Sequence, residues 1–384
     1  MNLPTDPFDS LARQLASDGP DAVLRSLDEA FRSEGKHHER FEVLKMRARR
    51  DLGLPLLATD RLEDLDEGLR NALEERLLEA CRSVGTDLME AGKLREGWMY
   101  LRPVGDRKSA SAFLRRAKLD ESNLDEVIEI ALGEGVDPEF GYGLVLEEFG
   151  TCNSITAFET QVRPLPKNDQ QACAALLVSH LHAELLRNVR DDIERRTGAA
   201  AVGERLIDLV ADRDWLFGEM SYHVDTTHLA STVRFARVLE TDEPIRLALD
   251  LTEYGRRLNE RFQYQGDAPF EQLHTASRLF FRTLLGEGID EGLAYFREKA
   301  IACDVYHQGS AAVEVYVDLL ARTGRLDDAI AMTLEKLPPG TRTQGIAPPL
   351  FELCRRRGDF EPMLRFCRDK QDRLGYATAL LSRG

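Results

Sequence analysis

The chain reads Gly324-Arg-Leu-Asp-Asp-Ala329 at one of three similar turns in its C-terminal third. The related stretches are Gly288-Ile-Asp-Glu-Gly292-Leu293 and Gly358-Asp-Phe-Glu-Pro-Met363, and the three glycines lie 36 and 34 residues apart. A glycine can adopt the left-handed conformation that ends one helix, and a small or apolar residue five positions later lets the next helix pack against it. The pattern therefore predicts successive pairs of antiparallel helices.

A fourth stretch, Gly92-Lys-Leu-Arg-Glu-Gly97, fits the same template far upstream. The period of about 34 residues and the turn pattern resemble tetratricopeptide-like repeats, which stack helix pairs. The first helix of that motif carries a small residue and an aromatic, whereas Val317 and Leu320 stand at those places before Gly324. The resemblance implies a degenerate helical-hairpin solenoid. It also implies the common role of that family, which is to hold a protein or peptide partner on a concave surface.

Helical periodicity extends over most of the chain. In residues 72–89, apolar side chains recur at steps of three and four residues, as on one face of a helix, whereas alternating strand patterns are scarce. The predicted fold is all-α: an N-terminal helical array over 1–132, a junction over 133–171, and a C-terminal array over 172–384 that is clearest over 288–384. These arrays are expected to stack into an α-α superhelix.

The predicted junction is rich in glycine. Segment 133–171 contains five glycines and three prolines, but it also contains Phe140, Tyr142 and Phe149, so part of it is expected to pack as an ordered loop or as short helices. Its glycines follow no phosphate-binding spacing, and the sequence gives no support for nucleotide binding there.

Composition excludes several function classes. The formal charge of −16 argues against a nucleic-acid partner, because such binding needs clustered cations. We found no apolar run long enough for a membrane span and no leader pattern, so no membrane association is expected. Six scattered cysteines without a C-x-x-C pair are typical of reduced thiols, and the chain is expected to be cytoplasmic.

Two segments are basic despite the acidic total. Residues 36–50 carry six basic and two acidic side chains, and residues 102–118 carry six and one. Such segments are usually solvated helix faces, although either could form a local surface for an anion or a partner.

Histidines are the most informative polar residues. Six of the eight lie between residues 180 and 307, and one group is His180-Leu-His182-Ala-Glu184, in which His180 and Glu184 share a helix face. The other group includes His223, Asp225 and His228, where Asp225 is predicted to cap a helix and His228 to lie in its first turn.

These groups suggest a metal site. Imidazole and carboxylate ligands suit zinc, iron or manganese, and three ligands with a vacancy for water would form an open site. The candidate ligands are His180, His223, Asp225 and His228, with Glu184 as proton acceptor for a metal-bound hydroxide. A histidine near a helix N-terminus could alternatively act as a base without metal, and the same residues could simply be core and capping residues.

Cys152, next to Asn153 within the glycine-rich segment, is a weaker candidate nucleophile. The preferred function is a cytoplasmic helical-repeat protein that holds a protein or peptide partner. The alternative is a metal-dependent, hydrolase-like enzyme with its His/Asp site at the centre of the array.

Overall fold

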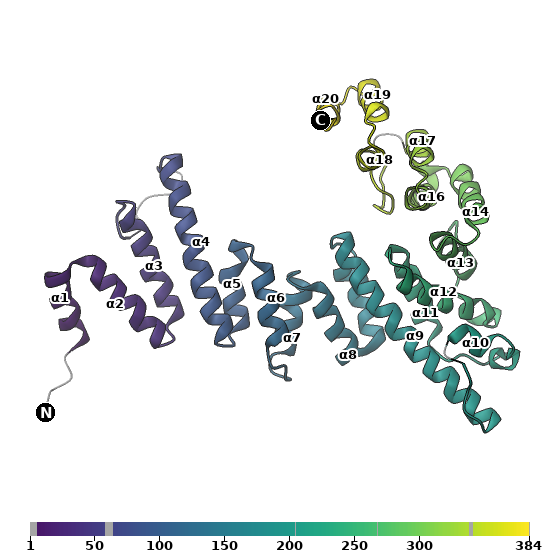
Figure 1. Ribbon diagram of the computed structural model, residues 1–384, viewed down its shortest axis with the longest axis horizontal. Coiled ribbons are helices and arrows are strands. Elements are labelled where there is room, and N and C mark those ends of the chain that lie inside the picture. The colour runs from purple at the N-terminus through teal and green to yellow at the C-terminus, as the bar shows by residue number, and fades with distance from the viewer. Residues whose placement is uncertain (1–5, 58–63, 204, 267, 338–340, 384) are drawn as a thin grey trace. The chain divides into compact units, whose positions relative to one another are not determined.

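The computed structural model describes residues 6–57, 64–203, 205–266, 268–337 and 341–383. Within these ranges the chain forms twenty α-helices and no strand, which confirms the all-α prediction (Figure 1). Helices account for nearly all the secondary structure, with short 3₁₀ and π turns between them. None of the described helices has the length and hydropathy needed to cross a membrane.

The chain divides into two compact units. Unit 1 comprises residues 1–149 and 160–165, and unit 2 comprises residues 150–159 and 166–384. The helices of unit 1 are α1 (Pro7–Asp18), α2 (Pro20–Ser33), α3 (His37–Asp51), α4 (Glu67–Glu90), α5 (Leu94–Val104), α6 (Arg107–Arg116) and α7 (Leu124–Ile128).

Each helix in the first part of unit 1 packs on the next one along the chain, from α1 to α6. The α4–α5 pair is especially close. A Cβ atom added at Gly97 would lie 2.7 Å from Met89 Cγ and 3.0 Å from Gly85 O, so only glycine lets these two backbones approach. The turn between them, at Gly92, has φ 78°, as the template predicts. Local sequence thus decides which helices become neighbours.

Unit 2 contains the longer array. Its helices are α9 (Lys167–Thr197), α10 (Leu206–Val210), α11 (Thr226–Phe235), α12 (Asp242–Arg257), α13 (Leu273–Leu284), α14 (Ile289–Ala302), α15 (Val305–Gln308), α16 (Ala311–Arg322), α17 (Leu326–Lys336), α18 (Leu350–Arg357), α19 (Glu361–Asp369) and α20 (Arg373–Leu381). The long helix α9 buries a stripe of residues at helical spacing, from Cys173 to Ile193, and packs on α11 and α12.

The three repeated turns of unit 2 have the expected geometry. Gly288, Gly324 and Gly358 have φ values of 62°, 78° and 73°, so each lies in the left-handed region that glycine tolerates best. They separate α13 from α14, α16 from α17, and α18 from α19, and in each case the two flanking helices pack together. The repeat therefore marks helix hairpins.

Most of the glycine-rich segment 133–171 is helical. It contains α8 (Pro138–Ala157), which is interrupted at Gly150 where φ is 74°, and a π-helical turn over Phe158–Val162. Tyr142 is fully buried. Gly150 is also the first residue assigned to unit 2, so the boundary between the units falls inside the segment.

Candidate functional site

The predicted site residue His223 lies just before α11, with its side chain only 6% exposed. Its Nδ1 is 2.8 Å from the Tyr254 hydroxyl oxygen, and its Nε2 is 3.2 Å from Asp192 Oδ2. A carboxylate can only accept, so Nε2–H donates to Asp192, and Nδ1 of the neutral ring accepts from the Tyr254 hydroxyl, whose oxygen also accepts from the His223 backbone N–H. Both ring nitrogens are therefore engaged within the protein.

Electrostatics keep this histidine neutral. Burial lowers the pKa of His223, and Arg195 and Arg196 add to that effect while Asp192 opposes it. Burial alone would raise the pKa of Asp192, but hydrogen bonds from His223 and Arg196 outweigh it and hold that pKa below its usual value. The result is an oriented, neutral imidazole beside a carboxylate, with neither ring nitrogen free to bind an ion or a substrate.

The second predicted residue of this group, Asp225, caps α11 as expected. Its Oδ1 accepts hydrogen bonds from the backbone N–H groups of Thr227, at 2.8 Å, and His228, at 3.2 Å. His223 and Asp225 both line a hollow of about 380 Å³, whereas the His228 side chain is not part of its lining. The other lining residues are Asn188, Asp191, Arg195, Tyr222 and Val224.

The first predicted group, His180, His182 and Glu184, lies on α9, N-terminal to Asp192. His182 is buried with Nε2 3.5 Å from Asp250 Oδ2, whereas His180 is exposed. His180 precedes Asp192, the partner of His223, by twelve residues, which is ~18 Å along a continuous helix at 1.5 Å per residue. His180 and His223 are thus too far apart to share one ion, whose ligand bonds are about 2 Å long.

The two remaining catalytic candidates, Glu184 and Cys152, lie on different helices. Glu184 is half-buried on α9, one turn after His180, and Cys152 is exposed in α8 two residues after Gly150. Among the described residues, no group of three or more histidine, cysteine, aspartate or glutamate side chains could hold a metal ion. The described part of the chain therefore offers the predicted zinc, iron or manganese no ready ligand set.

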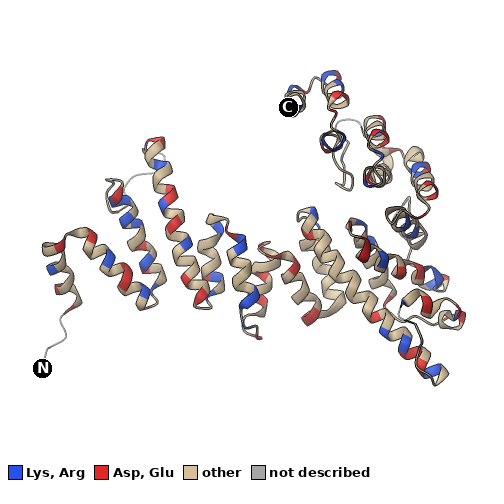
Figure 2. Ribbon diagram, viewed as in Figure 1, with Lys and Arg blue, Asp and Glu red and all other residues tan. Residues whose placement is uncertain are grey.

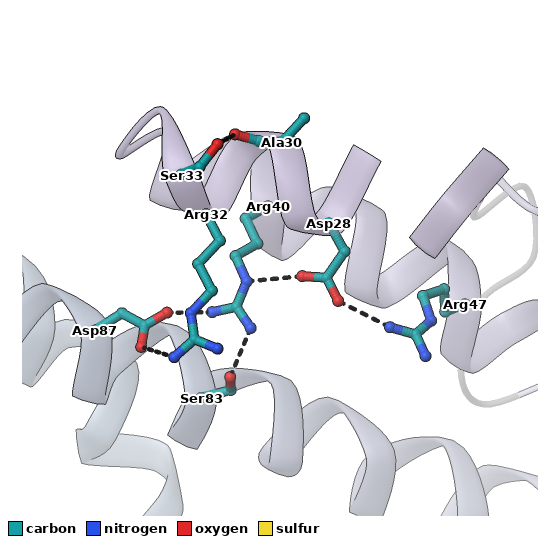
Figure 3. Close-up of polar contacts among 8 residues, drawn as sticks. All are labelled: Asp28, Ala30, Arg32, Ser33, Arg40, Arg47, Ser83 and Asp87. Carbon is teal, nitrogen blue, oxygen red and sulfur yellow. Dashed lines mark hydrogen bonds and ion pairs between the residues drawn. The ribbon is translucent and has the colours of Figure 1, made fainter. Parts of the chain in front are cut away.

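The basic segment 36–50 is paired with carboxylates of neighbouring helices. Arg40, only 6% exposed, binds Asp28 on α2 at 2.7 Å and Asp87 on α4 at 2.6 Å, and it donates to the Ser83 hydroxyl (Figure 3). Arg47 binds the other oxygen of Asp28. Figure 2 shows basic and acidic residues intermixed along these helices. Much of the local positive charge is thus already neutralised within unit 1.

A polar row on α16 was not singled out from the sequence. Ser310, Glu314 and Asp318 recur every four residues within a run that otherwise reads as an apolar helix, so they lie on one face. They are 0%, 1% and 4% exposed, respectively. Two carboxylates this deeply buried need partners, because an uncompensated buried charge is strongly unfavourable.

The partner of Glu314 is the main chain of residues 341–347, which we call the strap. One carboxylate oxygen of Glu314 accepts from the Gln344 N–H at 2.7 Å, and the other accepts from the Ile346 N–H at 2.9 Å. Between them Gly345 has φ 74°, which turns both N–H groups towards the same carboxylate. The Ser310 hydroxyl donates to the Arg342 carbonyl oxygen at 3.0 Å.

Asp318, the third residue of the row, is incompletely paired. Its Oδ2 lies 3.4 Å from Arg322 Nη1, but its Oδ1 has no hydrogen-bond partner among the described residues. The nearest cation to Oδ1 is Lys167 Nζ, at 3.8 Å, which also reaches the Ile346 carbonyl oxygen. Burial raises the pKa of Asp318 although Arg322 and Lys167 oppose it. Asp318 Oδ1 is thus ion-paired with Lys167 but accepts no hydrogen bond from the described residues.

Beside the strap lies a hollow of about 480 Å³ with a largely apolar lining. Glu314 borders it, together with α17, the strap and its continuation, and the α18–α19 region. The lining includes Leu334, Leu337, Pro348, Leu350 and Phe366. Glu314 thus offers a carboxylate that accepts main-chain N–H groups next to an apolar hollow, which is a combination suited to binding a peptide.

Comparison with known proteins found no matching family model, no similar curated protein and no similar solved structure.

Proposed function

We propose that this protein is a helical-repeat binding protein that holds a segment of a protein partner against α16. The observation that carries the proposal is Glu314, a carboxylate only 1% exposed, which binds main-chain N–H groups of a non-helical segment. Recognition through the main chain is how grooves accept peptides of varied sequence, while neighbouring pockets select side chains.

The architecture of unit 2 supports this proposal. The helix pairs α13–α14, α16–α17 and α18–α19 are joined by glycine turns, and α14 and α17 also pack on the following pair. Successive pairs that pack in this way would stack as a solenoid whose inner helices line one continuous surface. Helix α16 would be such an inner helix, because Ser310 and Glu314 of its polar row face the strap.

Two further features favour a protein partner in a reducing compartment. Arg40 and Arg47, in the basic segment 36–50, are bound by carboxylates of the same unit, which leaves less charge for a nucleic acid. All six cysteines are free thiols, the state that the cytoplasm maintains. We therefore propose that the protein acts in the cytoplasm.

The test is a selection of peptides from a random-peptide phage library on the purified full chain. Enriched peptides are then synthesised, and their affinity is measured by fluorescence anisotropy. Compared in a chain that carries Gln344→Pro and Ile346→Pro, so that the strap cannot donate to residue 314, Glu314→Gln should weaken binding at least about tenfold, because it replaces a charge-assisted acceptor with an amide that can offer only one oxygen.

The matched control is Glu352→Gln on α18. Glu352 is paired with Arg355 and Arg356 on its own helix and does not border the hollow beside the strap. This variant should bind the selected peptides as the wild type does. The proposal is wrong if no peptide is enriched, or if Glu314→Gln in that strap-free background binds the enriched peptides with unchanged affinity while remaining folded by circular dichroism.

A further inference from the structure

We infer that the strap, residues 341–347, is a resident competitor that occupies the α16 binding face in cis and must leave before a partner segment can bind. This inference rests on the proposed function. It specifies the regulation of that site, and it also specifies the chemistry of the partner: a segment that presents two main-chain N–H groups around a glycine, followed by a residue that is not proline.

The first argument is the length of the connection that carries the strap. Thirteen residues, 337–349, separate α17 from α18, whereas three residues separate α16 from α17, α18 from α19 and α19 from α20. Connections of this length inside a compact array are uncommon and usually have a function of their own. Helix α18 follows a connection far longer than the hairpin geometry requires.

The second argument is how the strap is held. Every contact described above joins its main chain to a side chain of the array: Ser310 to the Arg342 carbonyl, Glu314 to two N–H groups, and Lys167 to the Ile346 carbonyl. Arg342, Thr343 and Gln344 are exposed residues. Another segment with a similar backbone geometry could therefore make the same hydrogen bonds with α16.

The third argument is that the strap makes hydrogen bonds with the first two residues of the row but not with the third. Its contacts follow α16 from Ser310 to Glu314, and the next position of the row is Asp318, one turn and about 6 Å further along the helix. The chain continues as Pro348-Pro349, and proline has no N–H to donate. Asp318 Oδ1 accepts no hydrogen bond from the described part of the chain, although Lys167 Nζ lies 3.8 Å away. We infer that a partner residue with an N–H group at this point of the strap's path would donate to it.

The experiment uses two fluorescein-labelled probes, the peptide of residues 341–350 and the same peptide with Pro348→Ala. They are titrated into the wild-type chain and into a strap-released variant, Gln344→Pro with Ile346→Pro, which removes both N–H donors and leaves Glu314 intact. Because a tethered strap competes at an effective concentration in the millimolar range, release should tighten peptide binding at least about tenfold.

The matched control is Glu352→Gln on α18, which lies outside the strap and does not border the hollow. Its affinity should equal that of the wild type. In the strap-released variant, the Pro348→Ala peptide should bind about tenfold tighter than the native-sequence peptide, and Asp318→Ala should abolish that difference.

The outcomes separate the two proposals. Equal affinity of wild-type and strap-released protein for a peptide that binds both would refute the competing strap but not peptide binding. Failure of both proteins to bind these probes and any selected peptide would refute the proposed function itself. If the strap-released variant does not fold, hydrogen exchange in the wild type decides: saturating Pro348→Ala peptide should remove protection at the Gln344 and Ile346 amides, and unchanged protection would overturn the inference.

Discussion

His274 makes the stability of unit 2 depend on pH. It lies on α13, 4% exposed, with its ring against Gly255 of α12, and its Nδ1 has no hydrogen-bond partner in the described part of the chain. Burial, assisted by the charge of Arg256, lowers the pKa of His274 from 6.5 to about 4. The perturbation to test is His274→Leu, which removes the titrating group and keeps an apolar side chain of similar size.

The sign follows from proton binding in the two states. Between pH 6.5 and about 4, unfolded chains bind a proton at this residue and folded chains do not, so acid favours the unfolded state. The stability that depends on a neutral His274 is complete above pH 6.5 and is lost as the pH falls. Each pH unit in this window costs ~1.4 kcal/mol, which amounts to about 3 kcal/mol at pH 4.5.

The assay is urea unfolding at pH 7.5 and pH 4.5. The chain has two tryptophans, Trp98 in unit 1 and Trp215 in unit 2, so a Trp98→Phe background reports on unit 2 alone. The loss of stability between the two pH values should be about 3 kcal/mol smaller in His274→Leu than in its parent. The control His307→Gln alters a histidine that is 84% exposed and should leave the loss unchanged.

Two results would contradict this reasoning. One is an equal loss of stability in His274→Leu and its parent. The other is a pKa near 6.5 for His274 in the folded chain, read from ring-proton chemical shifts and assigned by the disappearance of one signal in His274→Leu.

Three further predictions concern other parts of the chain. Arg40→Ala should destabilise unit 1 by about 2–3 kcal/mol in urea, because Asp28 and Asp87 lose their buried partner and keep only the more exposed Arg47 and Arg32. Arg32→Ala, at a side chain 62% exposed, should cost under about 1 kcal/mol; equal effects of the two variants would contradict this account. Gly292→Ala should lower the free energy of unfolding of unit 2, followed by Trp215 fluorescence, by about 1–3 kcal/mol, because its Cβ would overlap the Thr283 side chain. An unchanged urea midpoint would refute the close packing of α13 and α14 at Gly292. Excess zinc should leave the melting temperature unchanged, because both ring nitrogens of His223 are engaged; a rise that His223→Ala abolishes would support the metal site instead.

Some of the site was visible in the sequence. Asp225 followed by two threonines and an apolar run predicted a helix cap, and the cap forms because that bond pattern needs only neighbouring residues. The partners of His223 were not predictable. Asp192 and Tyr254 each lie 31 residues away along the chain, one on either side, and only the packing of α9 and α12 brings them to the same ring.

The α16 row also shows that a sequence pattern does not reveal partners distant along the chain. The spacing of Ser310, Glu314 and Asp318 was present in the sequence, but polar residues at helical spacing usually face solvent. Whether the row faces water or another segment depends on where the strap lies, and the strap is joined to it by residues about 30 positions later. A pattern on one helix contains no information about that segment.

By itself, the sequence determined that the chain is all-helical and where its hairpins turn, since helix periodicity and left-handed glycines act over a few residues. It also determined the fit of α4 against α5, because Gly97 can be recognised from its place in the turn template. Only the tertiary structure decided which polar side chains are buried and what they bind. Burial depends on segments distant along the chain, and the free energy of a buried carboxylate or imidazole depends on the partners those segments supply.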